Sequence, residues 1–270
     1  MTTLQKTARF IAVALGLALS LAACGGGTSS APSNDANLSE TGQSSQAGPN
    51  LTGEITVLAA ASLTESFTVL ADQFMAEHDG TTVKLSFGSS SALALTVAEG
   101  SPVDILATAD LKSMDVAIAD YEDVEPLVFA GNDLVIAVAK DNPKAIEGLE
   151  QLSKSDLLVS KCAAEVPCGR LTGAAVEAGD LILNAVTEGA DVKATFAPLI
   201  TGEVDAALVY RTDALASANV DLVEIETHMA QQTEYPLAIL SDTGVAQAFY
   251  DYLLSDQGTQ VLAKHGFSKP

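Results

Sequence analysis

The run Glu54-Ile-Thr-Val-Leu-Ala-Ala60 decides the fold class, because it is a short β-rich segment that leads straight into a helical pattern. Ser62, followed three residues later by Glu65, has the pattern of a capping box at a helix start. Within residues 62–77 the large apolar residues recur at the spacing of one helix face: Leu63, Phe67, Leu70 and Phe74. The sequence therefore predicts a strand followed by a helix.

The same alternation continues along the chain. Strand patterns over 82–87 and 103–108 are followed by helical patterns over 91–99 and 112–119. The remaining segments are expected as strands at 134–139, 157–160, 206–210 and 235–240, and as helices at 169–178, 192–201, 243–254 and 257–265. Alternating strands and helices favour a mostly parallel sheet that is covered by helices on both faces.

We expect an α/β protein of two lobes, each built on a mostly parallel sheet flanked by helices, with a ligand cleft between the lobes. One lobe is predicted to hold residues 51–131 and 236–270, and the other residues 132–235. Two strands that cross between the lobes would then serve as a hinge for closure over a ligand.

The N-terminus has the pattern of a secretory signal over residues 1–23, since Lys6 and Arg9 precede a short apolar run. Leu21-Ala-Ala-Cys24 resembles a lipobox, which makes Cys24 the expected lipidation site; an ordinary signal peptide with a chance cysteine is the alternative. Residues 24–50 are rich in Gly, Ser, Asn, Pro and Gln, and we expect a flexible linker there.

The composition excludes several classes of function. The chain of 270 residues is 48% hydrophobic and 18% charged, which is typical of a globular protein. An aromatic fraction of 5% without Trp argues against binding of carbohydrates or single-stranded nucleic acids, which stack on aromatic rings. A net charge of −22 argues against binding to a phosphate backbone, so no nucleic-acid partner is expected.

Two cysteines remain in the predicted globular part, Cys162 and Cys168. A disulfide bond between them is favoured, because an extracytoplasmic compartment permits oxidation. A zinc site is the weaker alternative, since there are only two sulfurs and no histidine close by.

Four segments that precede predicted helices consist mainly of small residues: Ala60-Ala-Ser62-Leu, Phe87-Gly-Ser-Ser90-Ser, Val166-Pro-Cys168-Gly and Ala190-Asp-Val192-Lys. A helix N-terminus presents unpaired N–H groups and a partial positive charge, and so it can bind an anion. Ser62 and Ser90 add hydroxyl donors, and Tyr210 adds a phenolic one at the end of an apolar strand. A serine at such a position is more commonly a simple N-cap, so it is the combination that suggests a site.

These segments resemble the molybdate-binding proteins of ABC importers, and the resemblance extends in order over residues 54–268. Its carriers also include Ala109-Asp110, Ala207-Leu-Val-Tyr210, Glu234-Tyr-Pro and Phe249-Tyr-Asp-Tyr-Leu followed by Gly266-Phe. The resemblance implies a type II periplasmic-binding-protein fold. It also implies an extracytoplasmic, monomeric binding protein, lipid-anchored to the cell membrane through Cys24, that delivers molybdate or tungstate to an importer permease.

The resemblance places the oxyanion contacts on Ser62, Ser90, Cys168, Val192 and Tyr210. The serines and the tyrosine would use hydroxyls, whereas Cys168 and Val192 would use backbone N–H groups. The family commonly has a small residue such as Ala where Cys168 stands, and a backbone contact tolerates that change. No cofactor and no direct metal-ion ligand is implied, because the metal arrives as an oxyanion.

Uncharged donors suit a dianion that carries no proton, since the five positions contain no Asp or Glu to accept one. Other cargoes considered are sulfate, thiosulfate, phosphate and an organic acid. A secreted enzyme on the same fold is a further alternative, disfavoured because the histidines are scattered: His78, His228 and His265. A calcium-dependent adhesion module is disfavoured because no Asp-x-Asp-x-Asp-Gly loop occurs.

Overall fold

The computed structural model describes residues 51–270. The expected signal peptide over 1–23, the linker over 24–50 and the lipidation site Cys24 lie outside the described residues. Among residues 51–270, no helix is both long enough and apolar enough to span a membrane.

Strands and helices alternate through the first half of the described chain, as the hydrophobic pattern predicts. The elements of this half are β1 (Gly53–Ala60), a 3-10 turn (Ala61–Leu63), α1 (Thr64–Glu77), β2 (Thr81–Gly88), α2 (Ser90–Ala98), β3 (Ile105–Ala107), α3 (Leu111–Ala117) and β4 (Leu127–Ala139).

The second half continues the alternation and ends with two helices. Its elements are a 3-10 turn (Leu149–Ser153), β5 (Val159–Cys162), α4 (Pro167–Ala178), β6 (Ala185–Gly189), α5 (Val192–Ile200), β7 (Ala206–Tyr210), α6 (Arg211–Leu215), β8 (Val220–Val223), β9 (Gln232–Ile239), α7 (Gly244–Leu254) and α8 (Asp256–Lys264).

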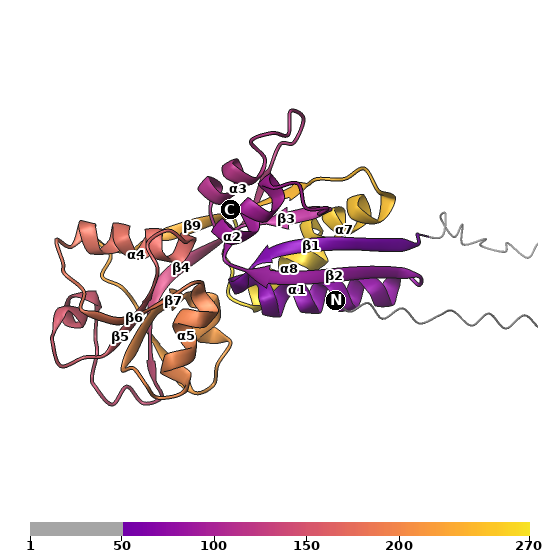
Figure 1. Cartoon of the computed structure of the whole chain (residues 1–270). Helices are drawn as coiled ribbons and strands as arrows, with labels where there is room; N and C mark the ends of the chain where they lie inside the picture. Colours follow the sequence, from indigo (N-terminus) through magenta and orange to yellow (C-terminus); the bar gives the residue numbers. More distant parts are fainter. Residues whose placement is uncertain (1–50) are drawn as a thin grey trace, which may run out of the picture. The chain divides into compact units, whose positions relative to one another are not determined.

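The strands form a continuous path in the order β2-β1-β3-β9-β4-β7-β5-β6 (Figure 1), and β8 pairs with β4 outside this path. The outer strands of each half pair in parallel, β1 with β2 and β3, and β5 with β6 and β7. The central strands β4 and β9 pair antiparallel with each other, β9 also with β3, and β4 also with β7 and β8. The two parallel groups are thus joined through two antiparallel strands.

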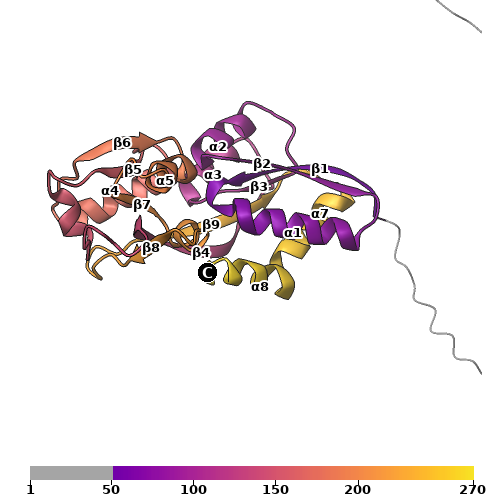
Figure 2. The ribbon, with the colours of Figure 1, turned by 90° about the horizontal axis from the view of Figure 1, so that it is seen from below.

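Strand β4 changes partner along its length, which divides the sheet into two parts (Figure 2). Residues 127–133 pair with β9, whereas residues 134–139 pair with β7 and β8. The sequence pattern predicts this strand only from residue 134. Residues 127–133 form a strand because they pair with β9, about a hundred residues later in the chain, and a local pattern does not record such a pairing. The change of partner, at 133/134, lies two residues beyond the boundary predicted between the lobes at 131/132. The lobe limits themselves remain a prediction.

The parallel strands are buried by helices on their faces. In the first part Phe67 and Phe74 of α1 are fully buried, and the ring of Phe74 contacts that of Phe249 in α7 at a centroid distance of 5.1 Å. Full burial of an aromatic side chain contributes roughly 1.5–3 kcal/mol. The predicted helical stripe of α1 is therefore confirmed as a core face.

The capping box predicted at Ser62 and Glu65 is wrong. Helix α1 begins only at Thr64, after a 3-10 turn, and its N-cap residue Leu63 makes no side-chain cap. The hydroxyl of Ser62 is buried and lies 2.7 Å from the hydroxyl of Tyr235, so a long-range partner replaces the local one. Glu65 instead contacts Lys193.

Substitution of Gly169 tests the packing at the start of α4. A Cβ on Gly169 would overlap the carbonyl oxygen of Ala163, whereas one on Gly173 in the same helix meets open space. We expect Gly169→Ala to lower the free energy of unfolding by about 1–3 kcal/mol through overpacking. Gly173→Ala, the matched control, should raise it by up to about 1 kcal/mol through helix propensity. Urea unfolding of both variants measures this, and equal effects would contradict the proposed close approach.

Candidate functional site

A small cavity lies where strand ends and helix starts of both parts meet. Its volume is about 220 Å³ including the open mouth, which is below the range of about 300–1,000 Å³ typical of pockets for drug-sized ligands. All five residues predicted as oxyanion contacts line it. The full lining is Ala60, Ala61, Ser62, Gly88, Ser89, Ser90, Ala109, Val166, Pro167, Cys168, Asp191, Val192 and Tyr210.

The first part of the sheet supplies two serine hydroxyls. Ser62 follows β1 and Ser90 is the first residue of α2, so both stand at the carboxyl ends of parallel strands, where ligands of open α/β sheets bind. Both are buried. The backbone N–H of Ala109 donates to the oxygen of Ser90 at 2.9 Å.

The second part supplies helix N-termini. Cys168 is the second residue of α4 and Val192 the first of α5. Backbone N–H groups of a first helical turn have no partner within the helix. Four such groups per helix and the helix dipole favour an anion at these two positions.

Tyr210 provides a phenolic hydroxyl at the end of β7. The side chain is fully buried, and its oxygen has no hydrogen-bond partner among residues 51–270. Burial, reinforced by the nearby Tyr235 and by two carboxylates, raises the pKa of Tyr210 well above its ordinary value, so the phenol keeps its hydrogen. A buried donor without an acceptor is costly, and its place in the cavity wall indicates a ligand.

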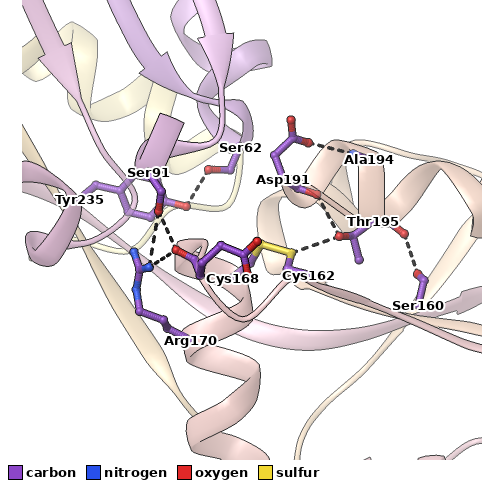
Figure 3. The surroundings of a disulfide bond; sticks show 11 residues. Ser62, Ser91, Ser160, Cys162, Cys168, Arg170, Asp191, Ala194, Thr195 and Tyr235 are labelled. Atoms are coloured by element: carbon purple, nitrogen blue, oxygen red, sulfur yellow. Dashed lines mark hydrogen bonds between the residues drawn. A yellow bond between two sulfur atoms is a disulfide. The ribbon is translucent and has the colours of Figure 1, made fainter. Parts of the chain in front are cut away.

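A disulfide joins Cys162 at the end of β5 to Cys168 in the first turn of α4, and this is the pairing that the sequence favoured (Figure 3). The two Cα atoms lie 5.7 Å apart. The hydroxyl oxygen of Thr195 in α5 lies 3.1 Å from the Cys162 sulfur and 2.9 Å from the carbonyl oxygen of Asp191. The bond therefore ties the anion-facing start of α4 to the strand, and α5 packs against the same sulfur.

The cavity wall contains a single carboxylate, and one of its oxygens caps a helix. Asp191 is the one charged residue in the lining, and its oxygen accepts from the N–H of Ala194 at 2.8 Å as the N-cap of α5. Figure 3 draws this carboxylate turned toward the helix. A ligand in the cavity thus meets N–H and O–H groups.

Ion pairs between the two parts of the sheet flank the cavity. Arg170 of α4 donates from Nε to Asp110 at 2.8 Å, and Lys193 of α5 lies 2.6 Å from Glu65 of α1. The hydroxyl of Ser91 also reaches across, to the carbonyl of Glu165 at 2.8 Å. The cations nearest the cavity are thus already paired with carboxylates, which leaves neutral donors to meet a ligand.

Asp213 of α6 is fully buried. Burial raises its pKa from 3.8 to about 6, against the attraction of Lys193, whose ammonium lies 2.9 Å away. Lys193 therefore contacts one carboxylate in each part of the sheet.

Comparison with known proteins identifies the family. Residues 55–268 match the family described as bacterial extracellular solute-binding protein. The chain belongs to this family. It is therefore a solute-binding protein that works outside the cytoplasm and not an enzyme, and its bound ligand is cargo rather than a cofactor.

Several relatives of this solute-binding protein have been named. The molybdate-binding protein ModA of Mycobacterium tuberculosis is 37% identical over 233 residues, which cover 84% of this chain and 89% of the relative. The ModA protein of Escherichia coli is 31% identical, with 80% and 89% covered. A putative ABC transporter substrate-binding lipoprotein, YvgL of Bacillus subtilis, is 29% identical, with 79% and 86% covered.

Solved structures share the fold of this solute-binding protein. The periplasmic molybdate-binding protein of Azotobacter vinelandii has a TM-score of 0.71 at 16% identity, with 80% of this chain and 99% of that chain covered. The sulfate-binding protein SubI of Mycobacterium tuberculosis has a TM-score of 0.70 at 19% identity, with 80% and 86% covered. The predicted periplasmic-binding-protein fold is confirmed.

Sequence reasoning missed some residues of the site. Ser89 lines the cavity, and its buried hydroxyl has no partner within residues 51–270. The run of three serines indicated a ligand-binding turn, but it did not show which of the three hydroxyls face the cavity. Tyr235 of β9 contacts Ser62, and Asn132 of β4 contacts Tyr235, and no local pattern connects these two residues to Ser62.

Within residues 51–270 no group of three or more His, Cys, Asp or Glu side chains is placed to hold a metal ion.

The raised pKa of Asp213 predicts a pH dependence of stability. As the pH rises from about 4 to about 6, the unfolded chain loses this proton before the folded chain does. Stability contributed by this group therefore falls by about 2 kcal/mol within this range, and by about 3 kcal/mol over the complete transition at about 1.4 kcal/mol per pKa unit. Asp213→Asn should lack this fall, whereas Asp79→Asn, at an exposed position, should keep it. Urea unfolding across this pH range measures the difference, and parallel curves for wild type and Asp213→Asn would contradict the assignment.

Proposed function

We propose that this solute-binding protein captures molybdate, and tungstate with it, in the cavity between Ser62, Ser90, Cys168, Val192 and Tyr210. The observation that carries the proposal is the buried phenol of Tyr210, a donor without an acceptor, in a small wall of neutral donors. An oxyanion oxygen in the cavity would supply the missing acceptor.

The donor set selects among anions by protonation. Molybdate is a dianion at neutral pH with four acceptor oxygens and no hydrogen, so it requires only donors. Hydrogen phosphate carries one hydrogen, which would need an acceptor in the wall, and the one carboxylate of the lining, that of Asp191, is turned toward α5, where one of its oxygens accepts from Ala194. Hydrogen bonds to a charged ligand contribute roughly 1.5–3 kcal/mol each, and several of them support micromolar to nanomolar affinity.

The relatives support the same cargo. Both ModA proteins are named for molybdate binding, and the Mycobacterium tuberculosis protein aligns over most of this chain. The sulfate-binding neighbour has the same fold at 19% identity, and it makes sulfate the alternative to test.

Delivery is proposed to follow the arrangement that the N-terminus suggests. Cleavage before Cys24 and lipidation of this residue would anchor the protein to the cell membrane, and residues 24–50 would tether the globular part as a monomer within reach of an ABC-importer permease. The name of the Bacillus subtilis relative, a substrate-binding lipoprotein, supports the anchor.

Calorimetry with a series of oxyanions tests the cargo. We expect molybdate and tungstate to bind with nanomolar to micromolar affinity, and sulfate and phosphate to bind about a hundredfold or more weakly, because sulfate is too small to reach all donors and phosphate is protonated. Sulfate binding as tight as that of molybdate would overturn the cargo and leave the fold in place.

Removal of single hydroxyls tests the site. Ser62→Ala, Ser90→Ala and Tyr210→Phe should each weaken molybdate binding by about 1–3 kcal/mol in calorimetry. Ser101→Ala, a serine outside the cavity lining, is the control and should bind as wild type does. Affinity unchanged by a given substitution would remove that hydroxyl from the proposed contacts.

A further inference from the structure

The Ser62 hydroxyl contacts a buried tyrosine, which in turn contacts a buried asparagine, and neither of these two side chains lines the cavity. The hydroxyl of Tyr235 lies 2.7 Å from the Ser62 oxygen, and the amide nitrogen of Asn132 lies 3.3 Å from the same phenolic oxygen. Asn132 is 1% exposed, Tyr235 0% and Ser62 3%, so water does not compete with these bonds. Asn132 belongs to β4 and Tyr235 to β9.

The backbone fixes which way the Asn132 amide points. Its oxygen accepts from the backbone N–H of Asp133 at 3.1 Å, and a backbone N–H can only donate. The amide nitrogen therefore faces Thr212, at 2.9 Å, and Tyr235. A rotated amide would set one donor against another at Asp133, so Asn132 donates to the phenol.

The single hydrogen of Tyr235 then has one destination. If Tyr235 donates to Ser62, then the amide hydrogens of Asn132 and the phenolic hydrogen all have acceptors, and the hydrogen left over is that of Ser62, which can point into the cavity. If Ser62 donated instead, then the phenolic hydrogen would have no acceptor among residues 51–270, which is unfavourable in a buried site. Tyr235 is therefore the donor in this bond.

Ser62 consequently keeps its own hydrogen for the cavity, which its side chain lines. Ser90 is in the same situation, because its oxygen accepts the N–H of Ala109. The peptide of Ala109 is held by Thr233, whose hydroxyl donates to the Ala109 carbonyl at 2.6 Å. Thr233 and Tyr235 lie two residues apart on β9, and so they face the same side of the strand.

We propose that Asn132 and Tyr235 are positioning residues that fix Ser62 as a donor toward the cavity, and that they thereby select oxyanions that carry no proton. This inference rests on the proposed function. A ligand hydroxyl needs an acceptor in the cavity wall, whereas Ser62, whose oxygen accepts from Tyr235, presents its hydrogen to the cavity. Removal of the phenolic hydroxyl would leave Ser62 free to rotate and to accept.

A double-mutant cycle tests the relay, with sodium molybdate as the probe in calorimetry. Tyr235→Phe should weaken molybdate binding about tenfold in the wild-type background, but less than about twofold in the Ser62→Ala background. Tyr235→Phe should also lower the preference for molybdate over hydrogen phosphate, because the freed Ser62 oxygen can accept. If the phenol had a purely structural role, Tyr235→Phe would weaken binding equally with and without the Ser62 hydroxyl, and the preference for molybdate over hydrogen phosphate would not change.

Asn132→Asp provides a second variant of nearly unchanged shape. The new carboxylate accepts the phenolic hydrogen of Tyr235, which is then no longer donated to Ser62. Ser62 instead donates its own hydrogen to the phenolic oxygen and has none left for the cavity. We expect a larger loss of molybdate affinity than for Tyr235→Phe. The new carboxylate also repels the bound anion directly, and this repulsion persists in the double variant Ser62→Ala/Asn132→Asp. The double-mutant cycle therefore subtracts the repulsion and leaves the loss of affinity that depends on Ser62.

Tyr252→Phe is the matched control, since its hydroxyl accepts from Gln257 at 2.7 Å in the helices α7 and α8, and it should leave molybdate affinity unchanged. Thermal unfolding confirms that each variant is folded. Equal losses from Tyr235→Phe in both backgrounds, together with no coupling for Asn132→Asp, would overturn the relay. An absence of molybdate binding by the wild-type protein would instead contradict the proposed cargo itself.

Discussion

The antiparallel pairing of β4 with β9 is the constraint on which the site depends. It places Asn132 opposite Thr233 and joins the two parallel groups of strands into one path. Residues diagonal to each other on one face of such a pair lie within reach of long side chains, which is how Asn132 contacts Tyr235. Because Tyr235 and Thr233 then reach Ser62 and Ala109, the crossing strands also determine how the donors of the cavity are oriented.

The wall of the cavity presents dipoles rather than unpaired cations. Arg170 and Lys193 stand at its edge, but each is paired with carboxylates of the other part of the sheet. A free cation at the centre would favour many anions and would lose a large hydration energy on burial. Fixed N–H and O–H groups hold their orientation without a ligand, so the geometry and protonation of the anion decide the affinity.

The N–H groups in the first turn of α4 are held in place by a covalent bond and by close packing. The disulfide ties the first turn of α4 to the end of β5, and Gly169 lets that turn approach the Ala163 carbonyl more closely than any other residue would. The N–H groups of this turn are therefore held in place before a ligand arrives. The same turn carries Arg170, whose pair with Asp110 links it to the first part of the sheet.

The sequence by itself determined the alternation of strands and helices, the helix starts that surround the cavity and the disulfide pairing, because these follow from local periodicity and from residues close together in the chain. It also marked Ser62, Ser90, Cys168, Val192 and Tyr210 as one group. It misassigned Ser62 to a local capping box, and it missed β6, β8 and the first part of β4. Only the tertiary structure decided those points, since the partner of Ser62 lies 173 residues away and the hydrogen bonds of β4 are made with β9. A buried hydroxyl takes the partner that the folded chain supplies, and no local pattern records which distant residue that is.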